Sequence, residues 1–267
     1  MFYLVSLLCL SCRDTKCQSI EPGALCVRLR LPPVGPAMCL RPENRDVHVV
    51  GSIRRHGLWE AGIATQFYAA IRQHPSAVVL DIGAHLGQYT LIAAAAGAQV
   101  IAFEANPDNA QYLRASLSMN KLSNVKLTAQ PAMHQSGIRM SFVSAVQRQQ
   151  HNNLGGWSVA RSTDGPLLST TVDEVIATNP EFANKSYIMK IDIEGNEPSA
   201  IAGATRVMAG VMVNYMEWGP NPVKPEKIDM ARSLEAMGLS VTDSACRNSR
   251  YLRCPWDVMW TRPGFLP

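Results

Sequence analysis

Short apolar runs alternate with amphipathic stretches along most of the chain from about residue 77 onward. The apolar runs predict strands, and the stretches between them, where apolar residues recur at helical spacing, predict helices. The expected strands are 77–81, 99–103, 125–129, 187–192, 211–217, 239–243 and 257–261. The expected helices are 87–96, 107–119, 171–177, 197–208 and 226–237. This alternation is typical of βαβ units, so the sequence predicts a doubly wound α/β fold with a mainly parallel sheet.

Two parts of the chain depart from this rhythm. Residues 20–57 contain five prolines and four glycines, which favour short edge strands and turns over a long helix. The apolar residues of 58–74 then recur at helical spacing until Pro75 ends the pattern. Residues 131–169 hold a predicted hairpin at 138–143 and a polar, glycine-rich segment, and a long insertion of this kind is typical of a lid or binding loop.

Length and composition fit one sizeable α/β domain. The chain has 267 residues, of which 47% are hydrophobic and 17% charged, values that predict a packed core. We divide it into an N-terminal extension over 1–40 and one domain over 41–267. The 25 basic and 21 acidic residues are scattered and give a net charge of +4. Because the basic residues form no cluster, we do not expect nucleic acid as a substrate.

The first twelve residues are nearly all apolar, a length too short to span a bilayer but suitable for a signal-peptide core. Arg13 and Lys16 follow this run, whereas the basic residues of a cleaved signal normally precede it. The pattern therefore leaves open a secretory signal or membrane anchor on one side and a buried N-terminal strand on the other. The secretory pathway and the cytoplasm both remain open as locations. No later segment is apolar enough to cross a membrane, so membrane association could come only through the N-terminus.

The seven cysteines form one group near the start, Cys9, Cys12, Cys17, Cys26 and Cys39, and a pair near the end, Cys246 and Cys254. No second close pair of Cys or His follows Cys9 and Cys12, so a zinc site is not expected. Cys246 and Cys254 flank a stretch that could turn between antiparallel strands, which leaves a cross-strand disulfide and two reduced thiols as alternatives. Asn184-Lys185-Ser186 is a glycosylation sequon, although such triplets often arise by chance.

The clearest chemical signal is the strand-turn-helix segment Val78–Gly87. Ligands of doubly wound sheets bind beyond the carboxyl ends of the strands, where the first strand turns into its helix. Gly83 and Gly87 permit a sharp turn and a close ligand, and Asp81 could accept a hydrogen bond from an ammonium group. Glu104 ends the next strand, about where an acidic residue binds ribose hydroxyls. The predicted cofactor-binding residues are Asp81, Gly83, Ala84, Gly87, Glu104 and Asn106.

A nicotinamide dinucleotide is the main alternative ligand for such a turn. Its motif is G-x-G-x-x-G, whereas here Asp81 precedes the first glycine and Ala84 follows it. An anionic Asp81 suits an ammonium better than a pyrophosphate. The segment therefore favours S-adenosylmethionine as cofactor over NAD, and also over a glycine turn with a merely structural aspartate.

Three segments carry a family resemblance: Leu80–Leu91, Phe103–Pro107, and Lys190–Gly195 with Glu197. They resemble the FkbM family of methyltransferases, over roughly residues 58–217 and including Thr170–Asp173. The resemblance implies a class I methyltransferase fold, which is Rossmann-like, with a seven-stranded sheet whose last strand is antiparallel. It also implies methyl transfer from S-adenosylmethionine, often to a hydroxyl of a sugar or natural product. Ala105 and His85 depart from the family's commoner proline and asparagine.

Lys190, Asp192 and Glu194 alternate along the end of the fourth predicted strand, so they are expected to point to one face. Methyl transfer needs a group that orients the acceptor and takes its proton, and we assign that role to Asp192, held ionised by Lys190. A structural ion pair is the alternative. Asp192, Glu194 and Glu217 could also collect a divalent cation, but we expect no metal.

The acceptor side has weaker signals. Trp157 could stack on a sugar ring, and His151, Asn152 and Asn153 offer polar groups, although such residues often only cap a loop. The predicted partner is a small-molecule or glycan hydroxyl. A nicotinamide-dependent oxidoreductase and a non-catalytic protein of the same fold remain the alternative functions, and the presence of both Asp81 and Glu104 argues against the non-catalytic one.

Overall fold

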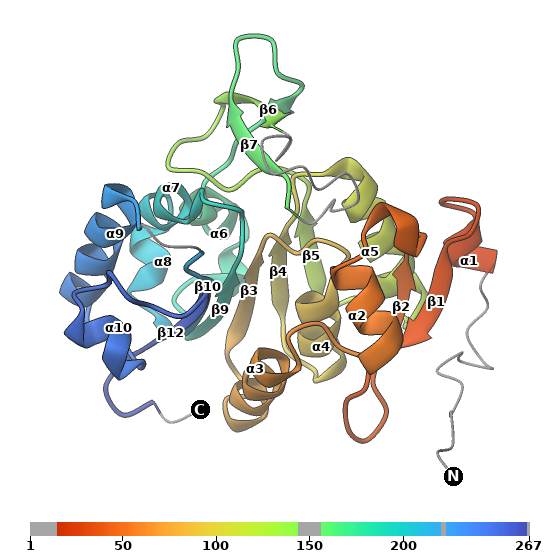
Figure 1. The fold of residues 1–267 in the computed structure, drawn as a ribbon, viewed down its shortest axis with the longest axis horizontal. Helices are drawn as coiled ribbons and strands as arrows, with labels where there is room; N and C mark the ends of the chain where they lie inside the picture. Colours follow the sequence, from red (N-terminus) through yellow and green to blue (C-terminus); the bar gives the residue numbers. More distant parts are fainter. Residues whose placement is uncertain (1–14, 144–155, 220–222, 266–267) are drawn as a thin grey trace.

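The computed structural model describes residues 15–143, 156–219 and 223–265 (Figure 1). Within these ranges the main sheet has seven strands in the order β11-β12-β10-β9-β3-β4-β5. Their bounds are β3 Val78–Ile82, β4 Val100–Phe103, β5 Val125–Thr128, β9 Tyr187–Ile191, β10 Val211–Glu217, β11 Ser240–Val241 and β12 Asp257–Thr261. The ends of each strand lie within two residues of the predicted ones, which confirms the α/β reading of the sequence.

Strand direction in this sheet follows the class I methyltransferase arrangement. β3 pairs in parallel with β4 and β9, β4 with β5, and β9 with β10. The last strand, β12, is antiparallel to both β10 and β11. The expected Rossmann-like, doubly wound sheet with an antiparallel last strand is therefore confirmed. The five parallel strands end at one edge of the sheet, where the loops that follow them meet.

Helices cover both faces of the sheet (Figure 1). α3 (Ala61–Gln73), α4 (Gln88–Ala95) and α5 (Pro107–Met119) pack on one face. The other face carries α6 (Val172–Ala177), α7 (Glu197–Ala202), α8 (Thr205–Met208), α9 (Pro225–Ala236) and α10 (Ser244–Asn248), with the short η3 (Pro180–Phe182) leading into β9. Alternate residues of each strand face opposite layers: Val79 packs with the first group, Val78 and Leu80 with the second.

The N-terminal part of the chain lies beside α5 (Figure 1). It comprises α1 (Thr15–Gln18), the antiparallel strands β1 (Leu25–Arg28) and β2 (Ala37–Leu40), η1 (Glu43–Arg45) and α2 (Val49–His56). A disulfide joins Cys17 to Cys39. Edge strands and turns were expected, but α2 was not. The apolar run at 1–12, with Cys9 and Cys12, lies outside the described residues.

The insertion after β5 forms a small antiparallel sheet rather than a lone hairpin. β6 (Arg139–Val143) pairs with β7 (Ser158–Arg161) and β8 (Leu167–Leu168). This sheet projects above the carboxyl edge of the main sheet, at the top of Figure 1. His151, Asn152 and Asn153 lie outside the described residues. The insertion is thus placed where a lid or binding loop would be.

Two further expectations change in detail. The helix predicted over 197–208 is divided into α7 and α8, because Gly203 lies against the Met133 carbonyl, where a Cβ would come within 2.0 Å of the oxygen. Cys246 and Cys254 do form a disulfide, but it links α10 to the loop before β12 instead of crossing two strands. Among the described residues, no helix has the length and apolar character needed to cross a membrane.

Candidate active site

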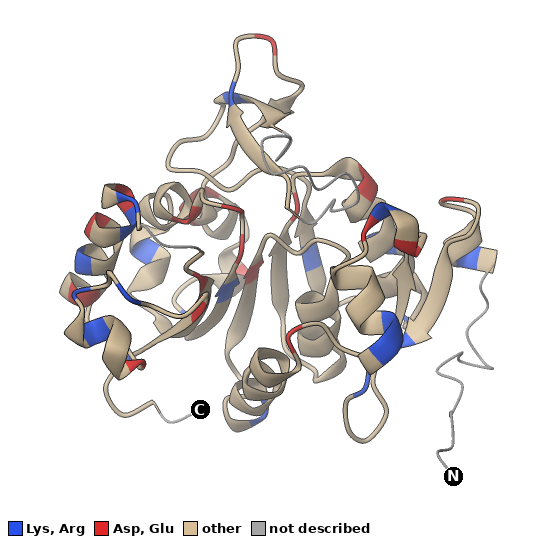
Figure 2. Ribbon diagram, in the orientation of Figure 1, with Lys and Arg blue, Asp and Glu red and all other residues tan. Residues whose placement is uncertain are grey.

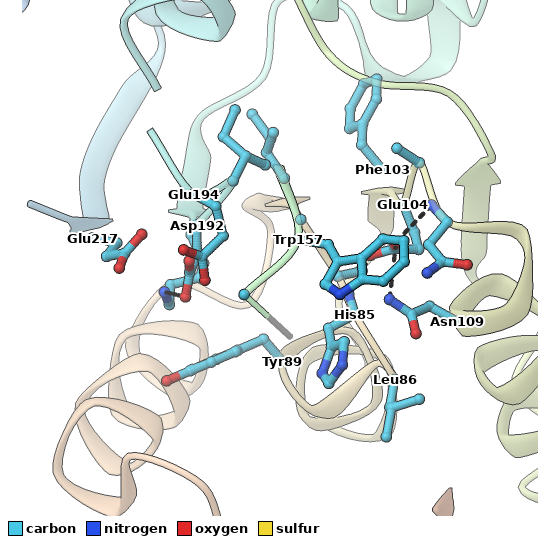
Figure 3. A pocket seen from close by; sticks show the side chains of 18 of the residues that line it. His85, Leu86, Tyr89, Phe103, Glu104, Asn109, Trp157, Asp192, Glu194 and Glu217 are labelled. Atoms are coloured by element: carbon cyan, nitrogen blue, oxygen red, sulfur yellow. Dashed lines mark hydrogen bonds and ion pairs between the residues drawn. The ribbon is translucent and has the colours of Figure 1, made fainter. Parts of the chain in front are cut away.

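A cavity of about 600 Å³ lies at the carboxyl edge of the sheet, beneath the small sheet of β6, β7 and β8 (Figure 3). Loops after four neighbouring parallel strands line it, together with residues from the N-terminal part and from the insertion. Of the predicted site residues, it is lined by Gly83, Ala84, Glu104, Asn106, Lys190, Asp192 and Glu194. Asp81 and Gly87 are not among its lining residues.

The glycine turn after β3 is held against two neighbouring strands. The backbone N–H groups of Gly83 and Ala84 both donate to the Phe103 carbonyl at 2.9 Å. Gly83 has φ +93°, and a Cβ there would lie 1.9 Å from the Asp192 carbonyl oxygen. Glycine is therefore required for the turn and for the close approach of β9. Gly87, at φ +98°, instead makes room for Leu113, where a Cβ would come within 2.3 Å of a methyl group.

Asp81 lies below the cavity and not in its wall. Its side chain is 1% exposed and accepts a hydrogen bond from the Thr90 hydroxyl at 2.5 Å. Burial raises the pKa of Asp81 to about 6, although the Thr90 hydrogen bond and the nearby Lys190 charge lower it. Asp81 therefore does not touch the cavity. When ionised, it places a negative charge beneath the glycine turn.

Glu104 is the best-held carboxylate of the cavity. Oε1 accepts from the Asn106 N–H at 2.8 Å and the Asn109 amide at 3.2 Å, and Oε2 accepts from the His85 N–H at 2.6 Å (Figure 3). Burial raises the pKa of Glu104, while the His85 charge and these hydrogen bonds lower it. Asn106 also begins α5, where its side chain accepts from the Asp108 N–H at 2.9 Å. A carboxylate fixed at a strand end in this way suits a vicinal diol such as that of ribose.

Lys190 and Asp192 form an ion pair at the end of β9. The Lys190 Nζ lies 3.1 Å from Asp192 Oδ2, and the lysine side chain is 2% exposed. Burial raises the pKa of Asp192, but the Lys190 charge and hydrogen bond outweigh it, so the pKa lies below its usual value. The pKa of Lys190 is raised because burial is outweighed by Asp192, Glu60 and Asp257. Asp192 therefore stays ionised in the cavity wall, as expected from the sequence.

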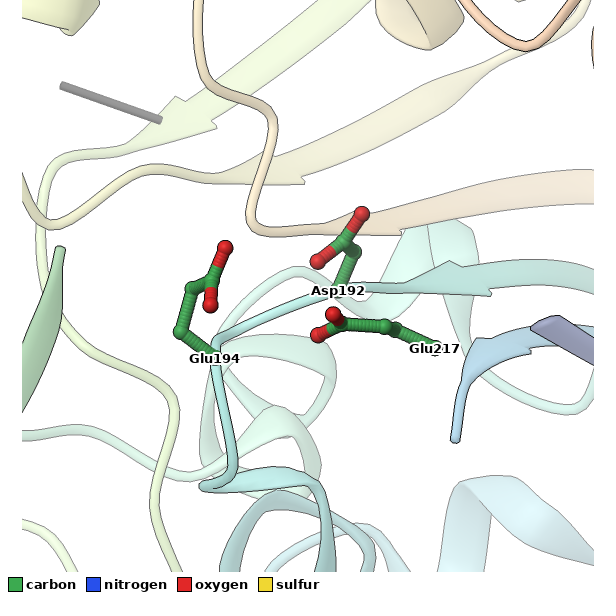
Figure 4. A group of neighbouring side chains, drawn as sticks. All are labelled: Asp192, Glu194 and Glu217. Carbon is green, nitrogen blue, oxygen red and sulfur yellow. The ribbon is translucent and has the colours of Figure 1, made fainter. Parts of the chain in front are cut away.

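Asp192, Glu194 and Glu217 bring their carboxylates together (Figure 4). One oxygen of each lies within 4.8 Å of the others. β9 ends at Ile191, so Glu194 is placed by a turn with φ +56° and not by strand alternation. Burial, together with the charges of Asp192 and Glu194, raises the pKa of Glu217 to about 9, so it is protonated at neutral pH. Trp256 Nε1 donates to Glu217 Oε1 at 3.0 Å.

Aromatic residues also line the cavity. Trp157 is 39% exposed and packs against Phe142 of β6, with ring centroids 6.0 Å apart. Trp59 and Glu60, just before α3, also line the cavity, and the Tyr89 hydroxyl donates to Glu60 at 3.0 Å. The sequence pointed to Trp157 but not to Glu60, because the only signal for Glu60 is its place at a helix start.

The cavity thus has two chemically distinct halves. The glycine turn, Glu104 and Asn106 offer polar groups suited to a nucleoside with a diol. Asp192, Glu194 and Glu217 offer hydrogen-bond acceptors, and protonated Glu217 a donor, beside aromatic faces. Lys190 keeps Asp192 ready to accept a proton.

Comparison with known proteins adds the following. The family model described as the methyltransferase FkbM domain matches residues 81–239, more than half of the chain. No curated protein sequence matches the chain. A putative O-methyltransferase from Klebsiella pneumoniae is 14% identical with a TM-score of 0.45, and the match covers 80% of this chain and 88% of that one. An O-methyltransferase from Bacillus cereus in complex with SAH is 10% identical with a TM-score of 0.44, over 94% and 91% of the two chains. A putative RNA methyltransferase from Pyrococcus horikoshii is 14% identical with a TM-score of 0.40, over 75% and 83%.

Proposed function

The chain belongs to the FkbM methyltransferase family and uses S-adenosylmethionine as methyl donor, and on this premise we propose that it methylates a hydroxyl oxygen of a sugar, glycan or small metabolite. The family membership decides against the nicotinamide-dependent oxidoreductase. The hydroxyl acceptor rests on the ion pair of Lys190 and Asp192 in the wall of the cavity.

The residues present fit the cofactor. Glu104 offers carboxylate oxygens and Asn106 an amide for a ribose diol, the glycine turn leaves room for the ligand, and Asp81 adds negative charge beneath a cationic ligand. When bound, S-adenosylmethionine supplies an electrophilic methyl group on a sulfonium. Glu104 would orient the nucleoside part of the cofactor. Gly83 keeps side chains out of the turn, so that the cofactor can approach the backbone.

Asp192 accepts the proton of the acceptor hydroxyl as the new oxygen–methyl bond forms and the sulfur–methyl bond breaks. The products are a methyl ether and S-adenosylhomocysteine, and the proton remains on the carboxylate until solvent removes it. Lys190 keeps Asp192 ionised before the step, and Glu194 and Glu217 provide further hydrogen bonds that orient the acceptor.

The charge of the cavity supports a neutral acceptor over a nucleic acid. Five residues with carboxyl groups line the cavity: Glu60, Glu104, Asp192, Glu194 and Glu217. Among the described residues, Lys190 is the only Lys or Arg that lines it. Glu217 is protonated and adds no charge, but the ionised carboxylates, Asp192 among them, repel phosphates. Basic and acidic residues are interspersed on α9, and the remaining Lys and Arg residues are spread over separate elements such as α2 and α10 (Figure 2), a distribution unlike a nucleic-acid footprint. Trp157 offers a face for a sugar ring.

The test is incubation with S-adenosylmethionine labelled in its methyl group and a panel of glycans, hydroxylated metabolites, proteins and RNA. We expect label in a methyl ether that is stable to base. We also expect the rate to persist in EDTA, because Lys190 already supplies the positive charge beside Asp192. Label on nitrogen or in RNA would overturn the hydroxyl proposal, and loss of activity in EDTA that Mg²⁺ restores would assign a cation to the three carboxylates.

A further inference from the structure

Two side chains of the N-terminal part, Arg41 and Asp46, contact the residues that donate hydrogen bonds to Glu104. Arg41 follows β2, is 2% exposed, and donates through Nη2 to the Asn109 amide oxygen. This contact fixes the orientation of the Asn109 amide, so that its nitrogen faces Glu104 at 3.2 Å. The Arg41 guanidinium also lies 5.4 Å from the centre of the Tyr112 ring. Arg41 therefore reaches Glu104 through one intermediate side chain.

Asp46 reaches the same carboxylate through His85. Its side chain is fully buried, with Oδ2 3.2 Å from His85 Nε2 and Oδ1 accepting from the Val49 N–H at 3.1 Å. His85 has φ +51°, a left-handed conformation that is unfavourable for a residue with a Cβ. Its ring is held by Asp46, and its N–H donates to Glu104 Oε2. The strained residue is thus fixed at both ends, beside the cavity.

We propose that Arg41 and Asp46 are positioning residues of the cofactor site, which fix the Glu104 carboxylate for the ribose diol through Asn109 and His85 respectively. Both lie ahead of residue 81, where the family domain begins. The inference rests on the proposed function only in placing the cofactor ribose at Glu104. It extends the cofactor site to a segment, residues 41–49, that contains no methyltransferase motif.

The test measures S-adenosylhomocysteine binding by calorimetry for R41M, R41K, D46N and E104Q, and for R41M and D46N each combined with E104Q. We expect R41M and D46N each to weaken binding about tenfold, since R41M removes the hydrogen bond that orients Asn109 and D46N removes the charge that faces the His85 ring. R41K, which keeps the charge but not the fork, is expected to lose less. Each double variant should bind no more weakly than E104Q alone, because the effect passes through Glu104.

The matched control is E43Q, an exposed carboxylate on the same segment that pairs with Arg54 and Arg55, and its binding is expected to stay unchanged. Losses that add to that of E104Q would show a structural role and overturn the proposal, as would unchanged binding in R41M and D46N. If the wild-type protein bound no S-adenosylhomocysteine, the proposed function itself would fail. Failure of the proposal and failure of the proposed function therefore give different binding results.

A second and independent observation concerns Asn184. The sequon Asn184-Lys185-Ser186 lies in an exposed turn between η3 and β9. This turn precedes β9, so it lies at the amino edge of the parallel strands, away from the cavity at the carboxyl edge. An attached glycan would therefore leave the cavity open.

The cysteines point to a compartment in which such a modification occurs. All five cysteines of the described residues are disulfide-bonded: Cys17, Cys26, Cys39, Cys246 and Cys254. Disulfides of this number persist in oxidising compartments and are rare in the cytosol. We infer that the protein acts in the secretory pathway or outside the cell and carries an N-linked oligosaccharide on Asn184.

The test is production of the full chain in insect cells, followed by treatment with a peptide N-glycosidase and mass spectrometry. We expect a mass loss on treatment, conversion of Asn184 to aspartate, and no glycan on N184Q. The matched variant S186T keeps the sequon and should keep the glycan. Wild-type protein with an unmodified Asn184, or with five cysteines that react with maleimide before reduction, would overturn the inference.

Discussion

At the scale of single residues, the chemistry depends on one buried cation. Lys190 lowers the pKa of Asp192 against the effect of burial. In K190M the carboxylate loses this partner, so we expect kcat to fall at least about 100-fold, the lower range for loss of a general base. The remaining activity should need a higher pH, because the pKa of Asp192 rises when the nearby positive charge is removed. The measurement is a pH profile of kcat/KM for both proteins.

Lys227 provides the control for this variant. It is also buried and pairs with a buried carboxylate, Glu197, at 3.1 Å; it donates to the Glu217 carbonyl at 3.4 Å, but its charge is not among those that shift the pKa of Asp192. K227M should therefore lower stability without moving the acid limb of the pH profile. A K190M enzyme with an unshifted profile would contradict the role of Asp192 as the proton acceptor.

The ionised form of Asp81 destabilises the folded protein, because its carboxylate is buried. Its pKa is about 6 in the folded protein and near 3.8 when unfolded, so the folded state binds the proton more tightly. Its contribution to the free energy of unfolding thus falls as pH rises from about 4 to 6, by roughly 3 kcal/mol. We expect D81N to be more stable than wild type by roughly 1–3 kcal/mol at pH 8 and to lose this advantage near pH 4.

Thermal unfolding without cofactor at pH 8 and pH 4 tests this expectation, with D229N as control because Asp229 is exposed. The stabilisation by bound S-adenosylmethionine should be smaller in D81N, since a cationic ligand offsets the cost of the buried carboxylate. If D81N and the wild type were equally stable at pH 8, burial of the Asp81 carboxylate would not destabilise the folded protein.

At the scale of secondary-structure elements, Gly83 determines how closely β3 and β9 approach at the cavity. In G83A a Cβ would meet the Asp192 carbonyl oxygen at 1.9 Å, and φ +93° is unfavourable for alanine. Gly97 has φ +92° with no atom within 4 Å of its Cβ position. We expect G97A to cost about 1 kcal/mol of unfolding free energy, and G83A at least twice that with a large loss of kcat. Denaturant titration gives the unfolding free energy of each variant, and enzyme kinetics gives kcat. G97A carries only the backbone strain, whereas G83A carries both the strain and the clash.

Trp157, just before β7 of the small sheet, is the aromatic residue that we propose for acceptor binding. This side chain is 39% exposed and lines the cavity, so its removal costs little stability. We expect W157A to raise KM for a sugar acceptor about 3- to 10-fold while KM for S-adenosylmethionine stays unchanged. L168A, at an exposed position of the same sheet, is the control. Equal changes in both KM values would place Trp157 in the cofactor half instead.

The elements themselves could largely be predicted from sequence, and the exceptions have physical causes. The strands are buried on both faces and read as unbroken apolar runs, so their ends are clear. Helix α2 was missed among prolines and glycines, although three basic residues before Gly57, which has φ +81°, form a recognisable helix end. The break at Gly203 could not be predicted, because it arises from a contact with Met133, distant in the sequence.

At the scale of the whole molecule, the candidate site joins segments that no single motif contains. The turn after β3 and the carboxylates after β9 and β10 could be predicted because parallel strands end at one edge. Asp46 and Glu60 could not, since Asp46 meets His85 only through the packing of the N-terminal part beside α5, and Glu60 meets Tyr89 only through the packing of α3 on α4. Tertiary packing of this kind leaves no periodic signal in the sequence.

The packing of the N-terminal part is secured by the Cys17–Cys39 disulfide, which ends two residues before Arg41. Replacing both cysteines by serine opens a cross-link between positions 22 residues apart, which should cost about 3 kcal/mol of unfolding free energy. Loss of the Cys246–Cys254 link, which spans 8 residues, should cost about 2.5 kcal/mol. The two variants are therefore similarly destabilised.

Their effects on the cofactor site should differ. The hairpin of β1 and β2 carries Arg41 and leads to Asp46, so the first variant is expected to bind S-adenosylhomocysteine several-fold more weakly at a temperature where both variants are folded. The second link lies between α10 and the loop before β12, and its loss should leave the affinity unchanged. Calorimetric titration at 15 °C, with circular dichroism to establish folding, distinguishes the cases. Equal affinities in both variants would mean that the N-terminal part stabilises the protein without shaping the cofactor site.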